Sequence, residues 1–205
     1  MNGAVAVPEK LLPFLLFMFV GAVTPGPNNM ISTASGATFG YARTVPQMLG
    51  VSLGFPVMIL AVGLGLGEVL RRAPWLHEAV RIAGAAFLLY FAWRIARAAG
   101  VEEKEASRPF TFLESALFQW LNPKSWTFAV GTIAAFTTPG LPFSGFLAET
   151  GTIAIISGAL AFVSLSVWCL FGVMIGRLLA DDRRRRIFQY ALAALLALSI
   201  VFLFV

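Results

Sequence analysis

Two short segments, far apart in the chain, combine proline with polar side chains: Thr24–Asn29, and Asn122–Lys124 preceded by Gln119. Proline lacks an amide N–H and clashes with the preceding helical turn, so each segment is expected to break a helix. Where a helix restarts, free N–H groups and about half a positive charge favour a carboxylate. Carbonyl groups left unpaired before the break favour an ammonium group. Because an α-amino acid carries both charges, the two breaks predict a binding site for a zwitterion.

Each break also contains a residue suited to begin a new helix ahead of a proline: Thr24 or Gly26 in the first segment, and Asn122 in the second. Amide side chains beside the breaks can donate and accept hydrogen bonds. The alternative interpretation is a pair of proline kinks whose freed backbone groups are satisfied by neighbouring helices. The candidate binding residues are Thr24, Pro25, Gly26, Pro27, Asn28, Asn29, Gln119, Asn122, Pro123 and Lys124.

Lys124 is the charged residue among these candidates. A charge deep in a membrane-spanning helix costs at least about 2.5–3.5 kcal/mol, so such a residue is normally functional and faces the bundle interior. We therefore predict that Lys124 adds positive charge to a carboxylate pocket or carries a proton. The alternative is a shorter span, with Lys124 at the membrane interface beside Trp120 and Trp126.

The composition requires that these segments lie in a membrane. The chain has 205 residues, of which 59% are hydrophobic and 12% charged, with a mean hydropathy of +0.83. Soluble domains carry about 25% charged residues. This composition excludes a soluble enzyme, a disulfide scaffold and a nucleic-acid-binding domain. With one cysteine, Cys169, and one histidine, His77, no Cys/His metal cluster is expected, and no cofactor is predicted.

Uncharged stretches predict an all-α protein with six transmembrane helices, at about 20 residues per span. The third uncharged stretch, 82–93, is too short to cross the bilayer alone. If its flanking arginines extend to the membrane interface, the third span covers about 76–97. The fourth span is expected at about 110–136. Glu114 and Glu149 are expected to be exposed beside apolar runs, and the alternative is that they titrate within the membrane if their spans extend further. The other long uncharged stretches are 11–42, 44–67, 150–176 and 187–205.

A polar connection at about 98–111 divides a single membrane domain, 1–205, into a first repeat at about 8–98 and a second at about 110–205. With three spans in each half, the second half enters the membrane from the opposite side to the first, which predicts an inverted repeat. Transporters of this kind bind their substrate where the two halves meet. Most basic residues fall on one side of this topology, which predicts that this side is cytoplasmic and that both termini lie outside. Small residues at four-residue spacing predict close helix packing, as at Gly36, Gly40, Gly172 and Gly176.

Four segments in order along the chain resemble the LysE/RhtB family of amino-acid exporters: 24–28, 49–54, 84–93 and 121–124. The resemblance implies six spans and export of amino acids or close derivatives, driven by the proton gradient. Within the family, 24–29 and 52–55 look most like the branch that exports cysteine and O-acetylserine. Phe55 and Pro56 stand where many relatives carry a polar or acidic residue, so the resemblance implies no cation site there.

The leading hypothesis is a secondary exporter, an antiporter of small neutral amino acids or their derivatives, in the cell inner membrane and not an enzyme. Its predicted partners are the substrate, protons and the lipid bilayer, and no nucleic acid is expected. The sequence does not determine the oligomeric state, and a homo-oligomer is one option. One alternative is a non-transporting membrane subunit. Another is an intramembrane enzyme, which the adjacent Lys124 and Ser125 do not favour, because neighbouring side chains on a helix point in different directions.

Overall fold

The computed structural model describes residues 7–98, 108–179 and 181–201, and within these ranges it is entirely helical. The prediction of an all-α protein is therefore confirmed. The predicted polar connection at 98–111 falls largely outside the described residues. The elements are α1 (Val7–Val23), α2 (Pro27–Phe39), α3 (Tyr41–Ala61), η1 (Val62–Leu66), α4 (Gly67–Arg72), α5 (Pro74–Arg97), α7 (Phe112–Phe118), η2 (Gln119–Leu121), α8 (Pro123–Phe136), α9 (Phe143–Leu178) and α10 (Asp182–Leu198).

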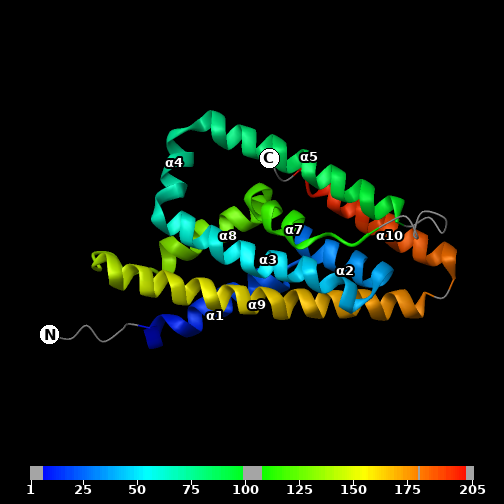
Figure 1. The fold of residues 1–205 in the computed structure, drawn as a ribbon, viewed down its shortest axis with the longest axis horizontal. Helices are drawn as coiled ribbons and strands as arrows, with labels where there is room; N and C mark the ends of the chain where they lie inside the picture. Colours follow the sequence, from blue (N-terminus) through cyan, green and yellow to red (C-terminus); the bar gives the residue numbers. More distant parts are fainter. Residues whose placement is uncertain (1–6, 99–107, 180, 202–205) are drawn as a thin grey trace.

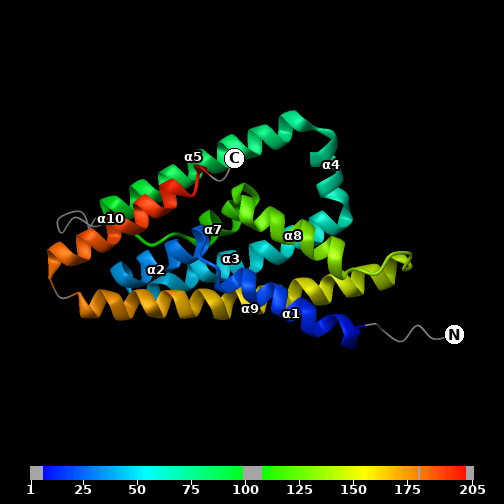
Figure 2. The same ribbon diagram turned by 180° about the vertical axis from the view of Figure 1, so that it is seen from behind.

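Most helices run roughly along the long axis of the molecule, and the two opposite views of the ribbon agree on this arrangement (Figures 1 and 2). Helix α9 packs against α2 and α3, α3 packs against α7, and α5 packs against α10. Short α4 carries the chain away from the end of α3 to the start of α5 (Figure 1). The two breaks thus lie inside the group formed by α1, α2, α3, α8 and α9.

Within the described residues, three helical segments are long and apolar enough to cross a bilayer: Tyr41–Val69, Glu78–Arg97 and Phe143–Leu178. A fourth crossing results if α1 and α2, which are bent by 53° at their break, count as one span. The predicted six spans are not reached by this measure, because the region expected to form the fourth span is divided into α7, η2 and α8, and α10 has 17 residues. The sequence predicted that the fifth span starts after Glu149. Helix α9 starts earlier, at Phe143, and has 36 residues.

Both predicted helix breaks are present. Helix α1 ends at Val23 and α2 starts at Pro27, while α7 continues as the 3₁₀ turn η2 and α8 starts at Pro123. A further irregularity was not predicted: the π-helical turn η1 contains Gly65 with a φ of 108°, a conformation that glycine adopts without steric cost. This turn separates α3 from α4.

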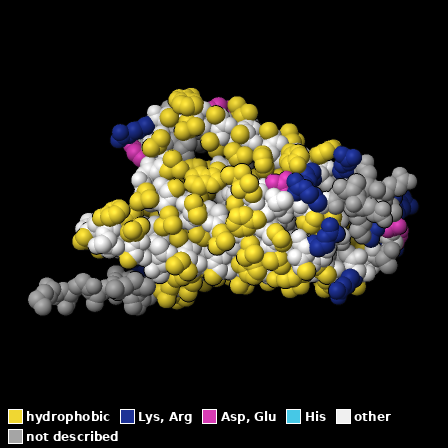
Figure 3. Space-filling view, viewed as in Figure 1, with side chains coloured by type: hydrophobic (Ala, Val, Ile, Leu, Met, Phe, Trp, Pro, Cys, Tyr) yellow, Lys and Arg dark blue, Asp and Glu magenta, His cyan; other side chains and the backbone are white. Residues whose placement is uncertain are grey.

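The face of the molecule seen in Figure 3 is largely hydrophobic, as a lipid-facing surface requires. Lysine and arginine side chains gather mainly at the end of the molecule where α5 and α9 finish and α10 begins, with a smaller group over α4 (Figure 3). This distribution agrees with the basic asymmetry in the sequence. The orientation of the termini stays a prediction.

Candidate functional site

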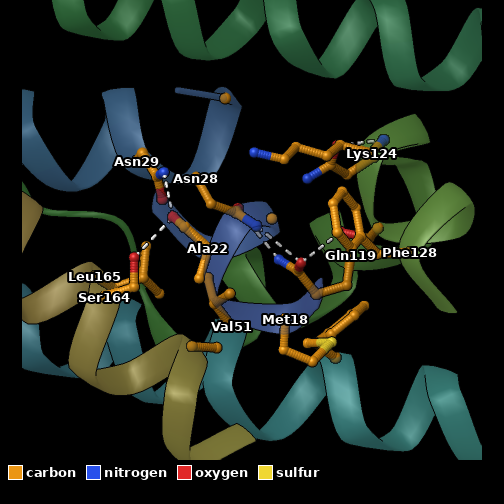
Figure 4. A pocket seen from close by; sticks show the side chains of 16 residues that line it. Met18, Ala22, Asn28, Asn29, Val51, Gln119, Lys124, Phe128, Ser164 and Leu165 are labelled. Carbon is orange, nitrogen blue, oxygen red and sulfur yellow. Dashed lines mark hydrogen bonds between the residues drawn. The ribbon is translucent and has the colours of Figure 1, made fainter. Parts of the chain in front are cut away.

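The two helix breaks lie against each other in the centre of the bundle. Lys124, in the first turn of α8, extends to the first break, where its Nζ donates a hydrogen bond of 2.6 Å to the carbonyl oxygen of Thr24. Asn28 of α2 and Gln119 of η2 exchange two side-chain hydrogen bonds, with N···O distances of 3.0 and 3.3 Å. Figure 4 shows the side chains of Asn28 and Gln119 directed toward each other, and Lys124 also lines the cavity. Segments far apart in the sequence therefore form one polar cluster.

Helix α8 begins as the sequence predicts. Asn122 is its N-cap, and the side-chain oxygen of Asn122 accepts a hydrogen bond of 3.1 Å from the backbone N–H of Lys124. Pro123 occupies the first helical position, where its missing N–H costs nothing. This cap fixes Lys124 in the first turn of the restarted helix.

Helix α2 begins at Pro27 with Gly26 as its N-cap, so the restart is the second of the two sites that the sequence allowed. No side chain caps this end. Thr24 does not serve as a cap, because its hydroxyl donates instead to the carbonyl of Val20, at 2.6 Å. Gly26 leaves room for Lys124: a Cβ at Gly26 would lie 2.9 Å from Cδ of that lysine.

The carbonyl groups at the end of α1 are already paired with side-chain donors. Asn29 Nδ2 donates to Ala22 at 2.9 Å and to Thr24 at 3.0 Å, and Ser164 of α9 donates to Ala22 at 2.8 Å. The sequence left these carbonyls open for a ligand ammonium group. In the structure, the ammonium of Lys124 and the amide of Asn29 occupy them.

A cavity of about 80 Å³ opens between the breaks (Figure 4). Six of the ten candidate residues line it, and the remaining four, Thr24, Pro25, Pro27 and Pro123, do not. Pro27 and Pro123 shape the helix starts, and Thr24 contributes its backbone carbonyl. The complete lining is Met18, Gly21, Ala22, Gly26, Asn28, Asn29, Val51, Phe55, Gln119, Asn122, Lys124, Ser125, Phe128, Ala161, Ser164 and Leu165.

Two polar residues of this lining were not predicted to contribute to the site. Ser125 donates to Gln119 Oε1 at 2.9 Å, and Ser164 reaches the end of α1 from the middle of α9. Ser125 follows the predicted motif directly, so its helical position could have indicated it. Ser164 lies in an apolar span with no local signal, and its role follows from the packing of α9.

Charge in the cavity comes from Lys124, the charged member of its described lining. Glu114 and Glu149 lie outside the lining, and both are paired, which corrects the expectation that they are exposed. Glu114 binds Arg94 and Arg108, and Glu149 accepts hydrogen bonds from the backbone N–H and the hydroxyl of Thr138. The described residues contain no group of three or more His, Cys, Asp and Glu side chains suited to a metal ion.

Comparison with known proteins gives consistent matches. Residues 19–205 match the LysE type translocator family. The cysteine/O-acetylserine efflux protein of Escherichia coli O157:H7 is 28% identical over 87% of this chain and 90% of its own length. Proteins with the same description from Escherichia coli K12 and Shigella sonnei are 27% identical over the same shares. No solved structure matches the chain.

Proposed function

Since the chain belongs to the LysE type translocator family, we propose that it is a secondary exporter of small neutral amino acids or their derivatives across the cytoplasmic membrane. The observation that carries the proposal is the central cavity in which two broken helices meet and in which Lys124 crosses from one break to the other. Paired interruptions of this kind are the usual place for a transporter substrate. The family membership supports transport rather than catalysis as the activity of this site.

Binding of a zwitterion would proceed by exchange of partners. The substrate carboxylate takes the ammonium of Lys124, and the substrate ammonium replaces that ammonium on the Thr24 carbonyl. The exchange replaces one charge-assisted hydrogen bond within the protein by two between the protein and the substrate, and the substrate gives up its hydrogen bonds to water in return. Asn28 and Gln119, which now satisfy each other, can turn toward the ligand without leaving the cavity.

The size and lining of the cavity support a small, neutral side chain on the substrate. Met18, Phe55 and Phe128 supply apolar walls, and among the described residues that line the cavity none is acidic and able to pair with a lysine or arginine side chain. The relatives named cysteine/O-acetylserine efflux proteins make cysteine and O-acetylserine the substrates to try first.

We further propose six crossings arranged as two inverted repeats, with protons as the coupling ion. In support, α1–α2, α3, α5, α7–α8, α9 and α10 alternate in direction along the long axis (Figure 1). The corresponding helices of the two halves also pack together, α3 with α9 and α5 with α10. The salt-bridge cluster at Glu114 and the hydrogen-bonded pair of Glu149 with Thr138 are two separate sets of contacts that could hold the two ends closed.

The decisive experiment measures transport by this chain alone. The purified protein in proteoliposomes is expected to move radiolabelled O-acetylserine, with a rate that rises when a pH gradient is imposed. Absence of flux for all small neutral amino acids would favour a non-transporting subunit, and a chemically altered product would favour an enzyme. Flux without any response to the pH gradient would remove proton coupling from the proposal.

Lys124→Met tests the site itself. The variant removes the charge that would bind the substrate carboxylate, so we expect export to be abolished while membrane insertion is retained. Arg186→Met is the matched control, because Arg186 is an exposed basic residue that does not line the cavity. Normal export by Lys124→Met would exclude this lysine from the mechanism.

A further inference from the structure

The aromatic ring of Phe128 lies in the wall of the central cavity, one helical turn after Lys124 on α8. Residues four apart on a helix are neighbours on one face. The ammonium nitrogen of Lys124 lies over this ring, 5.9 Å from its centroid. A cation within about 6 Å of a ring centroid is attracted by the negative face of the ring. Because the same nitrogen donates to the Thr24 carbonyl, a cation at this position has two partners.

Helix α1 holds the ring of Phe128 in this place. Phe17 packs on the ring with a centroid distance of 5.1 Å. A Cβ at Gly21 would overlap the ring, so the ring occupies space that a glycine leaves free at that position. The ring is therefore supported from α1 at the wall of the cavity and beside the first helix break.

The described lining of the cavity offers few other partners to a substrate ammonium. None of its residues is acidic. The carbonyl of Thr24 accepts a hydrogen bond from Asn29 as well as from Lys124, so the departure of Lys124 frees this oxygen for one new donor. An ammonium group taken out of water is costly unless further groups stabilise its charge. The ring of Phe128 lies next to the position that Lys124 leaves.

We propose that Phe128 is the residue by which the central cavity selects an amino group. The substrate ammonium binds between the Thr24 carbonyl and the ring of Phe128, in the place that the ammonium of Lys124 occupies in the structure. The attraction to the ring acts on the positive charge, so it distinguishes an amino acid from the same molecule without its amino group. The inference rests on the proposed function, since it takes the exported solute as its ligand.

Paired binding measurements on the full-length protein in nanodiscs test this role of Phe128. One ligand is radiolabelled O-acetylserine. The other is β-acetoxypropionate, the same molecule without the amino group, whose affinity is measured by competition with the first. The readout is the ratio of the two affinities. Both ligands bind the same empty protein, so any contribution of the contact between Lys124 and the ring before binding cancels from this ratio.

Phe128→Leu should lower the ratio about tenfold or more, because a cation–π contact in a desolvated site is worth this much. Replacement of Phe128 by mono-, di- and trifluorophenylalanine should lower the ratio stepwise. Fluorine withdraws electrons from the face of the ring and leaves its shape nearly unchanged. The fluorinated series therefore keeps the test valid if Phe128→Leu disturbs folding.

Phe136 is the matched control on the same helix. It packs on Phe17, with a centroid distance of 5.6 Å, as Phe128 does, but it does not line the cavity. The same fluorinated residues in place of Phe136 should leave the ratio at its wild-type value. An equal fall of the ratio at both positions would contradict a specific contact between the substrate and Phe128.

An unchanged ratio in Phe128→Leu and in the fluorinated series would overturn the role of Phe128. This holds even if both ligands bind more weakly, since the ring would then act by packing alone. Export of O-acetylserine would continue in that case, and the proposed function would stand. No binding of O-acetylserine to the wild type and no flux in proteoliposomes would overturn the proposed function, and this inference with it.

Discussion

The amide side chains of Asn28 and Gln119 connect the two broken helices through reciprocal hydrogen bonds. Gln119 is fully buried, and it also bonds Ser125 and the carbonyl of Ser115. Its loss would leave several buried groups without partners, and an unsatisfied buried polar group costs about 1–3 kcal/mol. The amide pair therefore contributes to stability as well as to the lining of the cavity.

We expect Gln119→Leu to lower the free energy of unfolding by about 2–3 kcal/mol. Asn28→Leu should lower the free energy of unfolding by less than Gln119→Leu does. The double variant should lose less stability than the sum of the two single losses, because both halves of one hydrogen-bonded pair are removed. Unfolding of the purified variants in detergent measures all three values.

The double variant Gln119→Leu/Thr152→Val is the control, because Thr152 is an exposed position on α9. The losses in the free energy of unfolding of its two single variants should add. Additivity of the Asn28 and Gln119 substitutions would show that the two amides do not stabilise each other.

Most of the site can be read from individual residues, since proline, asparagine and a lysine in an apolar region each have a strong local consequence. Asn122 and Lys124 were predicted in this way, and Gln119 was predicted as an amide beside the second break. Ser164 could not be, because a serine in an apolar helix carries no indication of its neighbour until α9 is placed beside the end of α1.

At the scale of the elements, α2 and α9 are held closely together by glycines. A Cβ at Gly36 would overlap the backbone of Cys169, and a Cβ at Gly172 would overlap the backbone carbonyl of Thr33. Backbone atoms cannot turn aside as a flexible side chain can. The close approach is what brings Ser164 to the break, and the small-residue spacing in the sequence predicted close packing without naming the partner.

Gly172→Ala should therefore push α9 from α2, with a loss of about 1–3 kcal/mol in the free energy of unfolding. It should also reduce export, because Ser164 would move away from Ala22. Gly151→Ala on the same helix is the matched control: no atom lies within 4 Å of its added Cβ, and alanine raises helix propensity. Equal stability of the two variants, measured by thermal unfolding in detergent, would contradict this account of the α2–α9 contact.

The breaks themselves were predictable from local chemistry, whereas η1 was not. Prolines at 25, 27 and 123 disfavour a continuous helix wherever the chain goes. The turn at Gly65 depends on the positions of α4 and α5 in the fold. A glycine permits such a turn but does not require it, so the sequence alone did not predict η1. The helix lengths likewise depend on how far each element continues beyond the bilayer, as α9 does.

At the scale of the whole molecule, the arginine-rich end is expected to face the cytoplasm, since basic residues collect on that side. In a Cys169→Ala background, Arg97→Cys and Arg177→Cys should react with an impermeant thiol reagent from the cytoplasmic side. Arg72→Cys and Ser144→Cys should react from outside. All four positions are exposed in the structure.

This labelling pattern requires that α5, the α7–α8 segment and α9 each cross the bilayer. Reaction of Arg97→Cys and Ser144→Cys from the same side would show that α7 and α8 re-enter without crossing. In that case the six-span topology would be wrong, although the central cavity would remain.

The sequence by itself determined that the chain is an all-helical membrane protein, where two of its helices break, and which residues at those breaks are polar. These properties depend on composition and on interactions within one or two helical turns, so they can be predicted without knowledge of the fold. The tertiary structure decided that the breaks meet, that Lys124 reaches Thr24, and that Phe17 and Gly21 of α1 lie against the ring of Phe128. Such contacts join residues that are distant in the chain, and packing alone fixes them.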